Sequence, residues 1–205
     1  MDINEERIAF YFEVGLATTQ WASVEMALSA VVVELFKPED AVSAVVGFRA
    51  IENFRSKLEY VDALIRVKVR DSTRLSEWDS LCDRCQQAAK KRNRVAHNWV
   101  LNSPSEERAG RRIMLSPLRP AKNSDSPHGA KYPGAIYLRD IASYRLEFAA
   151  LMAAIENFVD RLGGRPERFP KAQEQPPNPP KIHELRRQIY MFAKRPPRSP
   201  RAQRQ

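Results

Sequence analysis

The sequence is poor in several residue types, and each shortage argues against a class of protein. Only 7 of its 205 residues are glycine, which disfavours a glycine-rich nucleotide fold and a turn-dense β-sandwich. Two cysteines cannot form a disulfide framework, and no N-terminal stretch resembles a signal peptide. The longest apolar run, around residues 30–33, lies between Glu25 and Glu34 and is too short to span a membrane. We therefore expect a soluble cytoplasmic protein with no membrane partner.

The sequence does contain enough apolar residues, 43%, for one sizeable hydrophobic core. Its formal net charge of +9 is concentrated at one end. Residues 163–205 hold 11 Lys and Arg against 3 Asp and Glu, together with 9 of the 15 prolines, whereas residues 1–162 hold 23 basic and 22 acidic residues. This division predicts a globular domain over residues 1–162 and a basic, proline-rich tail over residues 163–205.

Within the tail, one stretch has apolar residues at helical spacing. Ile182, Leu185, Ile189 and Phe192 recur every three or four residues, which predicts a short helix over residues 181–193. Two roles for the tail remain open. It could add non-specific affinity for RNA through its charge, or it could be a solvated linker that docks a partner through the short helix.

Apolar residues three or four apart predict four long helices within residues 1–162. They cover residues 4–36, residues 39–69, a third stretch that begins at an expected cap region, residues 71–73, and reaches Trp99, and residues 140–162. Asp140 is the expected N-cap of the last helix, and Gly163 and Gly164 are expected to close it. These spans predict an all-α fold, an up-and-down bundle of four to five helices.

Residues 103–138 differ from the rest of the predicted domain because five prolines alternate with polar residues. Two short apolar stretches, at residues 112–118 and 135–139, are candidates for strands. They predict a small β-hairpin insertion with a long tip, placed between the third and fourth long helices.

The residues with the clearest chemical potential lie at the end of the third predicted helix, in the segment KKRNRVAHNW over residues 90–99. On a helix, Asn93 and His97 share one face, because they are four residues apart. Arg92 lies about 140° round the helix from His97. Arg92 also occupies a position where the apolar stripe would place a hydrophobic residue. We therefore expect it to point toward another helix or subunit.

The segment RNRVAH, Arg92 to His97, resembles the R-x4–6-H motif of the HEPN superfamily (higher eukaryotes and prokaryotes nucleotide-binding), in which a polar residue often follows the arginine, as Asn93 does here. The pair Trp21 and Glu25 in the first helix also resembles a pair found in many bacterial members of this superfamily. The resemblance implies a helical bundle that forms a homodimer and cleaves RNA with no metal or cofactor, two motifs facing each other. Some subfamilies carry tyrosine where this chain has Trp99, so control by modification of that tyrosine is not expected.

The same residue types suit such chemistry. A histidine at position 97 can act as a base on the ribose 2′-hydroxyl or as an acid on the leaving 5′ oxygen. Arg92 offers donors to the phosphate, and Asn93 could orient the imidazole or bind the phosphate. For RNA binding we expect Lys90, Lys91 and Arg94 to contribute by electrostatic attraction. Trp99 is expected to pack in the bundle with Trp21 and Trp78, and its alternative role is to stack on an RNA base at the mouth of the site.

Three functions therefore follow from the sequence. The preferred one is a metal-independent HEPN-type endoribonuclease, a bacterial toxin or antiphage defence effector whose partners are RNA, a second copy and an antitoxin or regulatory protein. The alternative is a catalytically silent HEPN-like module that binds RNA or a protein. The third is a helical adaptor in which the motif arises by chance, because arginine and histidine at this spacing are common in helices.

Other residues that could carry chemistry have simpler interpretations. Cys82 and Cys85 form a single C-x2-C pair on the apolar stripe and are expected to be core thiols, because no second ligand pair is present. His128 and His183 have no metal-ligand spacing, so no metal is assigned. Glu25 and Glu52 interrupt apolar helical patterns. Each of these two glutamates is either a buried carboxylate that orients Arg92 or part of a solvated helix face.

Overall fold

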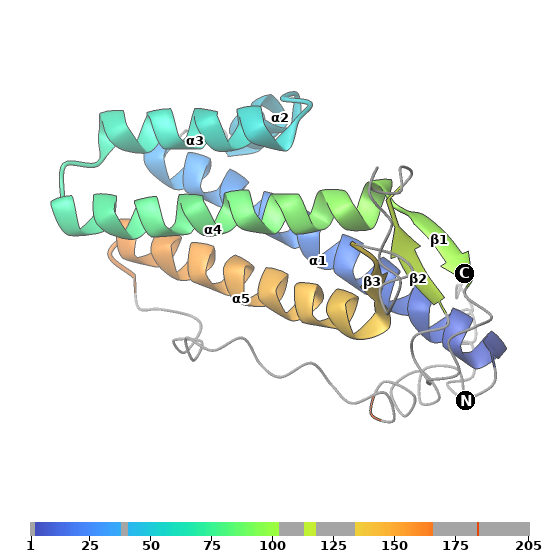
Figure 1. Ribbon diagram of the computed structural model, residues 1–205. Coiled ribbons are helices and arrows are strands. Elements are labelled where there is room, and N and C mark those ends of the chain that lie inside the picture. Colours follow the sequence, from blue (N-terminus) through green and yellow to red (C-terminus); the bar gives the residue numbers. More distant parts are fainter. Residues whose placement is uncertain (1–2, 38–40, 103–112, 118–133, 166–183, 185–205) are drawn as a thin grey trace, which may run out of the picture.

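The structure is a computed structural model that describes residues 3–37, 41–102, 113–117, 134–165 and 184. Within these residues the chain forms five helices and three short strands: α1 (Ile3–Phe36), α2 (Ala41–Arg49), α3 (Phe54–Lys68), α4 (Ser72–His97), β1 (Trp99–Asn102), β2 (Ile113–Ser116), β3 (Ile136–Tyr137) and α5 (Leu138–Leu162). The four long helices lie side by side, and the small sheet lies at the C-terminal end of α4 (Figure 1). The prediction of a mostly helical chain is confirmed.

The core forms where α1 packs along α5 and both contact α4. Trp21 of α1 lies between two other rings, 4.6 Å from Phe54 and 5.4 Å from Phe148 between centroids. Further along the bundle, Trp78 of α4 packs on Phe158 of α5 at 5.7 Å. Aromatic contacts of this kind add to the free energy gained by burying the rings. They fix how α4 approaches α1 and α5, and so place the end of α4.

Helix α1 combines a long apolar sequence with buried carboxylates. By length and composition it could cross a membrane, although a core helix of a soluble protein passes the same test. The helix as a whole thus meets the length and composition criterion for a membrane span, which the short apolar run around residues 30–33 does not meet alone. Here its buried face includes Glu6 and Glu13, and Glu13 pairs with Arg145 of α5. In this fold α1 therefore acts as the central core helix, and the absence of a membrane partner stays a prediction.

Two predicted helix ends are confirmed. The Asp71 side chain accepts hydrogen bonds from the backbone nitrogens of Thr73 and Arg74, at 2.9 and 3.1 Å, and so caps α4. Gly163 closes α5 through a hydrogen bond from its nitrogen to the Val159 carbonyl oxygen. Gly164 follows with a φ of +68°, a backbone conformation that glycine adopts without steric cost.

Two other predicted boundaries are wrong. The stretch 39–69 is two helices, α2 and α3, because Asn53 is extended and its side chain accepts a hydrogen bond from the Ser56 nitrogen at 2.8 Å, which starts a new helix. Helix α5 begins at Leu138, after the N-cap residue Tyr137. Asp140 instead lies in the first turn, where its carboxylate accepts a hydrogen bond from the Tyr137 nitrogen at 2.9 Å.

The β-insertion contains one more strand than expected. The predicted pair is present as β2 and β3, which are antiparallel with Leu115 opposite Ile136. The additional strand, β1, pairs with β2 along its whole length, with Trp99 opposite Ser116. The prediction that the third long helix reaches Trp99 is therefore wrong, because α4 ends at His97 and Asn98 turns the chain into an extended conformation. The predicted tail helix at 181–193 lies outside the described residues, apart from Glu184.

Candidate functional site

The end of α4 places the three predicted catalytic residues at different depths. Arg92 is half-buried, with 29% of its side chain exposed, whereas Asn93 and His97 are exposed. Arg92 Nη1 donates a hydrogen bond to Asn93 Oδ1 at 3.0 Å. Within the part of the chain that the structure describes, the His97 side chain makes no hydrogen bond or ion pair. The structure thus joins Arg92 to Asn93 and leaves the imidazole accessible to a ligand.

Two residues of α1 hold the Arg92 guanidinium. Arg92 Nη2 lies 3.6 Å from Glu25 Oε1, and the guanidinium carbon lies 5.4 Å from the centroid of the Trp21 ring. The same carboxylate oxygen accepts a hydrogen bond from Trp21 Nε1 at 2.7 Å. Trp21 and Glu25 are four residues apart, so α1 presents both on one face. Of the two carboxylates considered from the sequence, Glu25 reaches Arg92, whereas Glu52 is exposed.

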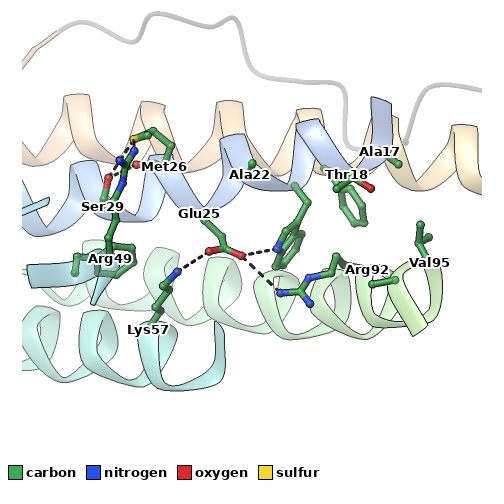
Figure 2. A pocket seen from close by; sticks show the side chains of 14 residues that line it. Ala17, Thr18, Ala22, Glu25, Met26, Ser29, Arg49, Lys57, Arg92 and Val95 are labelled. Carbon is green, nitrogen blue, oxygen red and sulfur yellow. Dashed lines mark hydrogen bonds and ion pairs between the residues drawn. The ribbon is translucent and has the colours of Figure 1, made fainter. Parts of the chain in front are cut away.

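Lys57 of α3 completes this cluster and was missed in the sequence. Lys57 Nζ donates to Glu25 Oε2 at 2.7 Å, and only 12% of the lysine side chain is exposed. Figure 2 shows Glu25 reaching from α1 between Lys57 and Arg92. The single sequence signal for Lys57 is its place beside the buried Leu58, at the edge of the apolar face of α3. Because α2 and α3 were expected to be one continuous helix, the direction of this face relative to Glu25 could not be predicted.

A groove of about 460 Å³ opens beside this cluster, and we call it the α1 groove (Figure 2). Helix α1 forms one side, and α2, α3 and α4 contribute the other, with Phe148 of α5 also lining it. Its charged side chains are three cations and one carboxylate: Arg49, Lys57, Arg92 and Glu25. Its small side chains are those of Ala17, Thr18, Ala22, Ser29 and Ala96. The α1 groove is thus a mostly apolar depression with a net excess of cations, and it reaches Ala96, the residue before His97.

Two of the predicted RNA-binding cations contact α5 and the chain before β3 instead of the groove. Lys91 forms an ion pair with Glu147, and its ammonium lies over the Tyr144 ring at 5.4 Å from the centroid. Arg94 donates to the Tyr144 hydroxyl at 3.2 Å and to the Gly134 carbonyl oxygen at 3.1 Å. Both side chains therefore fasten α4 to its neighbours. Their role in RNA binding stays a prediction.

The other two predicted RNA-binding residues lie on the surface. Lys90 is exposed on α4. Trp99, the first residue of β1, has 60% of its surface exposed, whereas Trp21 and Trp78 are buried. Of the two interpretations of Trp99, packing inside the bundle is excluded by this exposure. A side chain in this position is accessible to a base, and it lies two residues beyond His97.

The two cysteines are packed into the bundle, as expected for core thiols. Cys85 is fully buried, and burial raises the pKa of its thiol to about 12. Burial also raises the pKa of the half-buried Cys82, and nearby Asp62 adds to the effect. Within the described residues no group of three His, Cys, Asp or Glu side chains could hold a metal ion. The other two histidines considered, His128 and His183, lie outside these residues.

These pKa values predict that Cys85 is chemically inert in the folded protein. At pH 8 a thiol with a pKa of about 12 is ionised in only about one molecule in ten thousand, and the thiolate is the reactive species. Iodoacetamide is therefore expected to alkylate Cys85 only after denaturation, as measured by mass spectrometry of the labelled peptide. Rapid alkylation of Cys85 in the native protein would show that the thiol is accessible and ionised, contrary to this packing.

Comparisons of the chain with known protein family models, with curated proteins and with solved structures find no match.

Proposed function

We propose that this protein is a metal-independent endoribonuclease of the HEPN type, which acts in the cytoplasm as a homodimer. The observation that carries the proposal is the fixed position of Arg92. Its guanidinium lies against Glu25 and Trp21 at the edge of the α1 groove, and the solvent-accessible His97 follows five residues later. Arg92 thus presents a cation in the α1 groove, and His97, the residue after the groove-lining Ala96, supplies a group that can transfer protons.

The chemistry assigns one task to each residue. His97 removes the proton from the ribose 2′-hydroxyl, and the 2′ oxygen then attacks the adjacent phosphorus. The bond from phosphorus to the 5′ oxygen breaks, which leaves a 2′,3′-cyclic phosphate and a 5′-hydroxyl. Arg92 stabilises the negative charge that develops on the phosphate oxygens. A guanidinium has five N–H donors, and the contacts to Asn93 and Glu25 do not use all of them.

A dimer supplies the second proton-transfer group that this reaction needs. The departing 5′ oxygen must receive a proton while His97 of the same copy holds the one taken from the 2′-hydroxyl. His97 of a second copy can provide it if the two motifs face each other across a two-fold axis. The exposure of His97 at the very end of α4 is compatible with such an arrangement. A biological role as a toxin or antiphage effector, held in check by an antitoxin or regulatory protein, is proposed from the family resemblance alone.

Cleavage of an end-labelled structured RNA in the presence of EDTA tests the proposal. Wild-type protein is expected to cut the RNA without added metal and to leave 2′,3′-cyclic phosphate ends, whereas the double variant Arg92→Ala/His97→Ala is expected to leave it intact. Sedimentation of the same samples reports whether the protein is dimeric. Cleavage by the double variant would identify a contaminant or a different site and would overturn the assignment.

A catalytically silent HEPN-like module is the second candidate, and one observation favours it. Among the described residues, no side chain orients the His97 imidazole, whereas acid–base catalysts are commonly held by a hydrogen-bonded neighbour. If purified dimeric wild-type protein binds several RNAs but cuts none of them, this second candidate becomes the better description of the chain.

A further inference from the structure

We propose that the α1 groove is the path of a single-stranded RNA and that Arg49 and Lys57 contact its phosphates in addition to Arg92. This inference deepens the proposed function, on which it rests for the identity of the ligand. Neither Arg49 nor Lys57 is part of the R-x4–6-H motif, and each comes from a different helix, α2 and α3. The proposal therefore assigns substrate contacts to a part of the fold that the motif does not reach.

The charge of the α1 groove suits a polyanion. Arg49, Lys57 and Arg92 face a single carboxylate, Glu25, which leaves an excess of positive charge in the groove. Both oxygens of the Glu25 carboxylate already accept hydrogen bonds, one from the Trp21 N–H and the other from the Lys57 ammonium. An ammonium has three N–H donors, so Lys57 retains donors for a phosphate. The carboxylate thus positions two cations instead of repelling a phosphodiester chain.

The shape of the groove suits one strand and excludes a duplex. Ala22 of α1 and Ala96 of α4 both line the groove with small side chains, so a sugar-phosphate backbone can approach both helices closely. From Thr18 to Ser29 the α1 side extends over roughly 16 Å at about 1.5 Å of rise per residue. A volume of about 460 Å³ is in the usual range of small-molecule pockets. Such a space holds one or a few nucleotides, whereas a double helix is too wide.

The position of the groove links it to the proposed chemistry. Its α4 side ends at Ala96, and the exposed His97 is the next residue, so the groove ends one residue before the proposed proton-transfer group. Lys91 and Arg94 instead contact Glu147 and Tyr144 of α5. Compared with these two residues, the cations of the α1 groove are therefore better placed to follow a strand.

Binding of a fluorescently labelled, single-stranded 2′-O-methyl RNA to the full-length chain tests this path, because such RNA lacks the attacking hydroxyl and is not cut. Fluorescence anisotropy is measured over a series of salt concentrations. Arg49→Gln and Lys57→Gln are each expected to weaken binding several-fold and to reduce the slope of log affinity against log salt by about 0.7, the value for one phosphate contact with a single strand. The basic tail is present in every variant, so differences between variants report on the groove.

Two further variants make the test independent of folding and of general charge. Ala22→Glu adds a carboxylate inside the groove at an exposed helical position and is expected to weaken binding several-fold without loss of thermal stability. Arg55→Gln removes the same charge as the groove variants from α3, two residues before Lys57, where 88% of the side chain is exposed and Glu59 is the partner. We expect Arg55→Gln to bind within twofold of the wild type.

The outcomes separate this proposal from the proposed function. If Arg49→Gln, Lys57→Gln and Ala22→Glu all bind as Arg55→Gln does, the path is wrong even if the protein cuts RNA. If they bind weakly but wild-type protein cuts no RNA, the path holds and the nuclease assignment fails. If unlabelled duplex RNA competes as well as the single strand, the groove is not the site of binding and the proposal is overturned.

Discussion

Replacement of His97 by alanine is expected to lower the rate of RNA cleavage by about 10²- to 10⁴-fold, the range for loss of a general acid or base. The substitution removes the proton-transfer group while leaving Arg92 and its contacts with Glu25 intact. Because His97 is exposed at the last position of α4, the melting temperature is expected to change little. Single-turnover cleavage of labelled RNA in EDTA measures the rate, and circular dichroism measures the melting temperature.

A matched substitution on the same helix controls for effects of the mutation itself. Gln87 is exposed on α4, ten residues before His97, and Gln87→Ala is expected to cleave RNA at the wild-type rate. Arg92→Ala should also lose activity. Unlike His97→Ala, however, it removes a partner of Glu25 and is expected to lower the melting temperature. A His97→Ala protein that cuts RNA within threefold of the wild-type rate would exclude His97 from proton transfer and would favour the silent module.

The second large effect concerns stability. Arg145→Met is expected to lower the free energy of unfolding by about 3–5 kcal/mol, because it leaves a buried carboxylate without its cation. The partner, Glu13, is completely buried on α1, and its two oxygens lie 2.9 and 3.4 Å from Arg145 Nε and Nη2 of α5. The pair joins the two helices that share the most extensive packing in the fold. Urea denaturation followed by circular dichroism measures the loss.

A double substitution and a substitution in an exposed ion pair test whether the loss of stability comes from the unpaired buried charge. Glu13→Leu/Arg145→Met removes both charges and is expected to recover much of the lost stability, since the cost arises from the unpaired buried charge. The pair of Arg55 and Glu59 on α3 is exposed, and Arg55→Ala is expected to cause no measurable change. If Arg145→Met unfolds at the same urea concentration as Arg55→Ala, the buried pair does not contribute as the structure indicates.

Features of the fold that depend on nearby residues could be predicted from the sequence. The Asp71 cap and the Gly163–Gly164 end are local hydrogen-bonding devices, so sequence position alone reveals them. The break before Asn53 was missed because the apolar spacing continues through it, and a single side-chain hydrogen bond decides the boundary. Strand β1 was missed because its residues follow a helix directly and become a strand only through pairing with β2.

The residues of the candidate site divide in the same way, into those that can be recognised within one helix and those that depend on packing between helices. The motif on α4 and the pair Trp21 and Glu25 on α1 are each visible within one helix. Lys57 and Arg49 are not, because their approach to Glu25 and Arg92 depends on how α2 and α3 pack on α1. The packing of α4 also decides which contacts Lys91 and Arg94 make. In the sequence they form one cationic run with Arg92, but the helix directs them to α5.

The direct passage from α4 into β1 has a consequence for how the chain can change in evolution. Only Asn98 separates His97 from a strand whose four residues are all paired with β2. The C-terminal end of α4 is therefore held by the packing of the helix before it and by the pairing of β1 with β2 after it. An insertion or deletion at Asn98 would shift His97 relative to β1, because no other residue lies between the helix and the strand. We therefore expect homologous chains to keep a single residue between the helix and the strand.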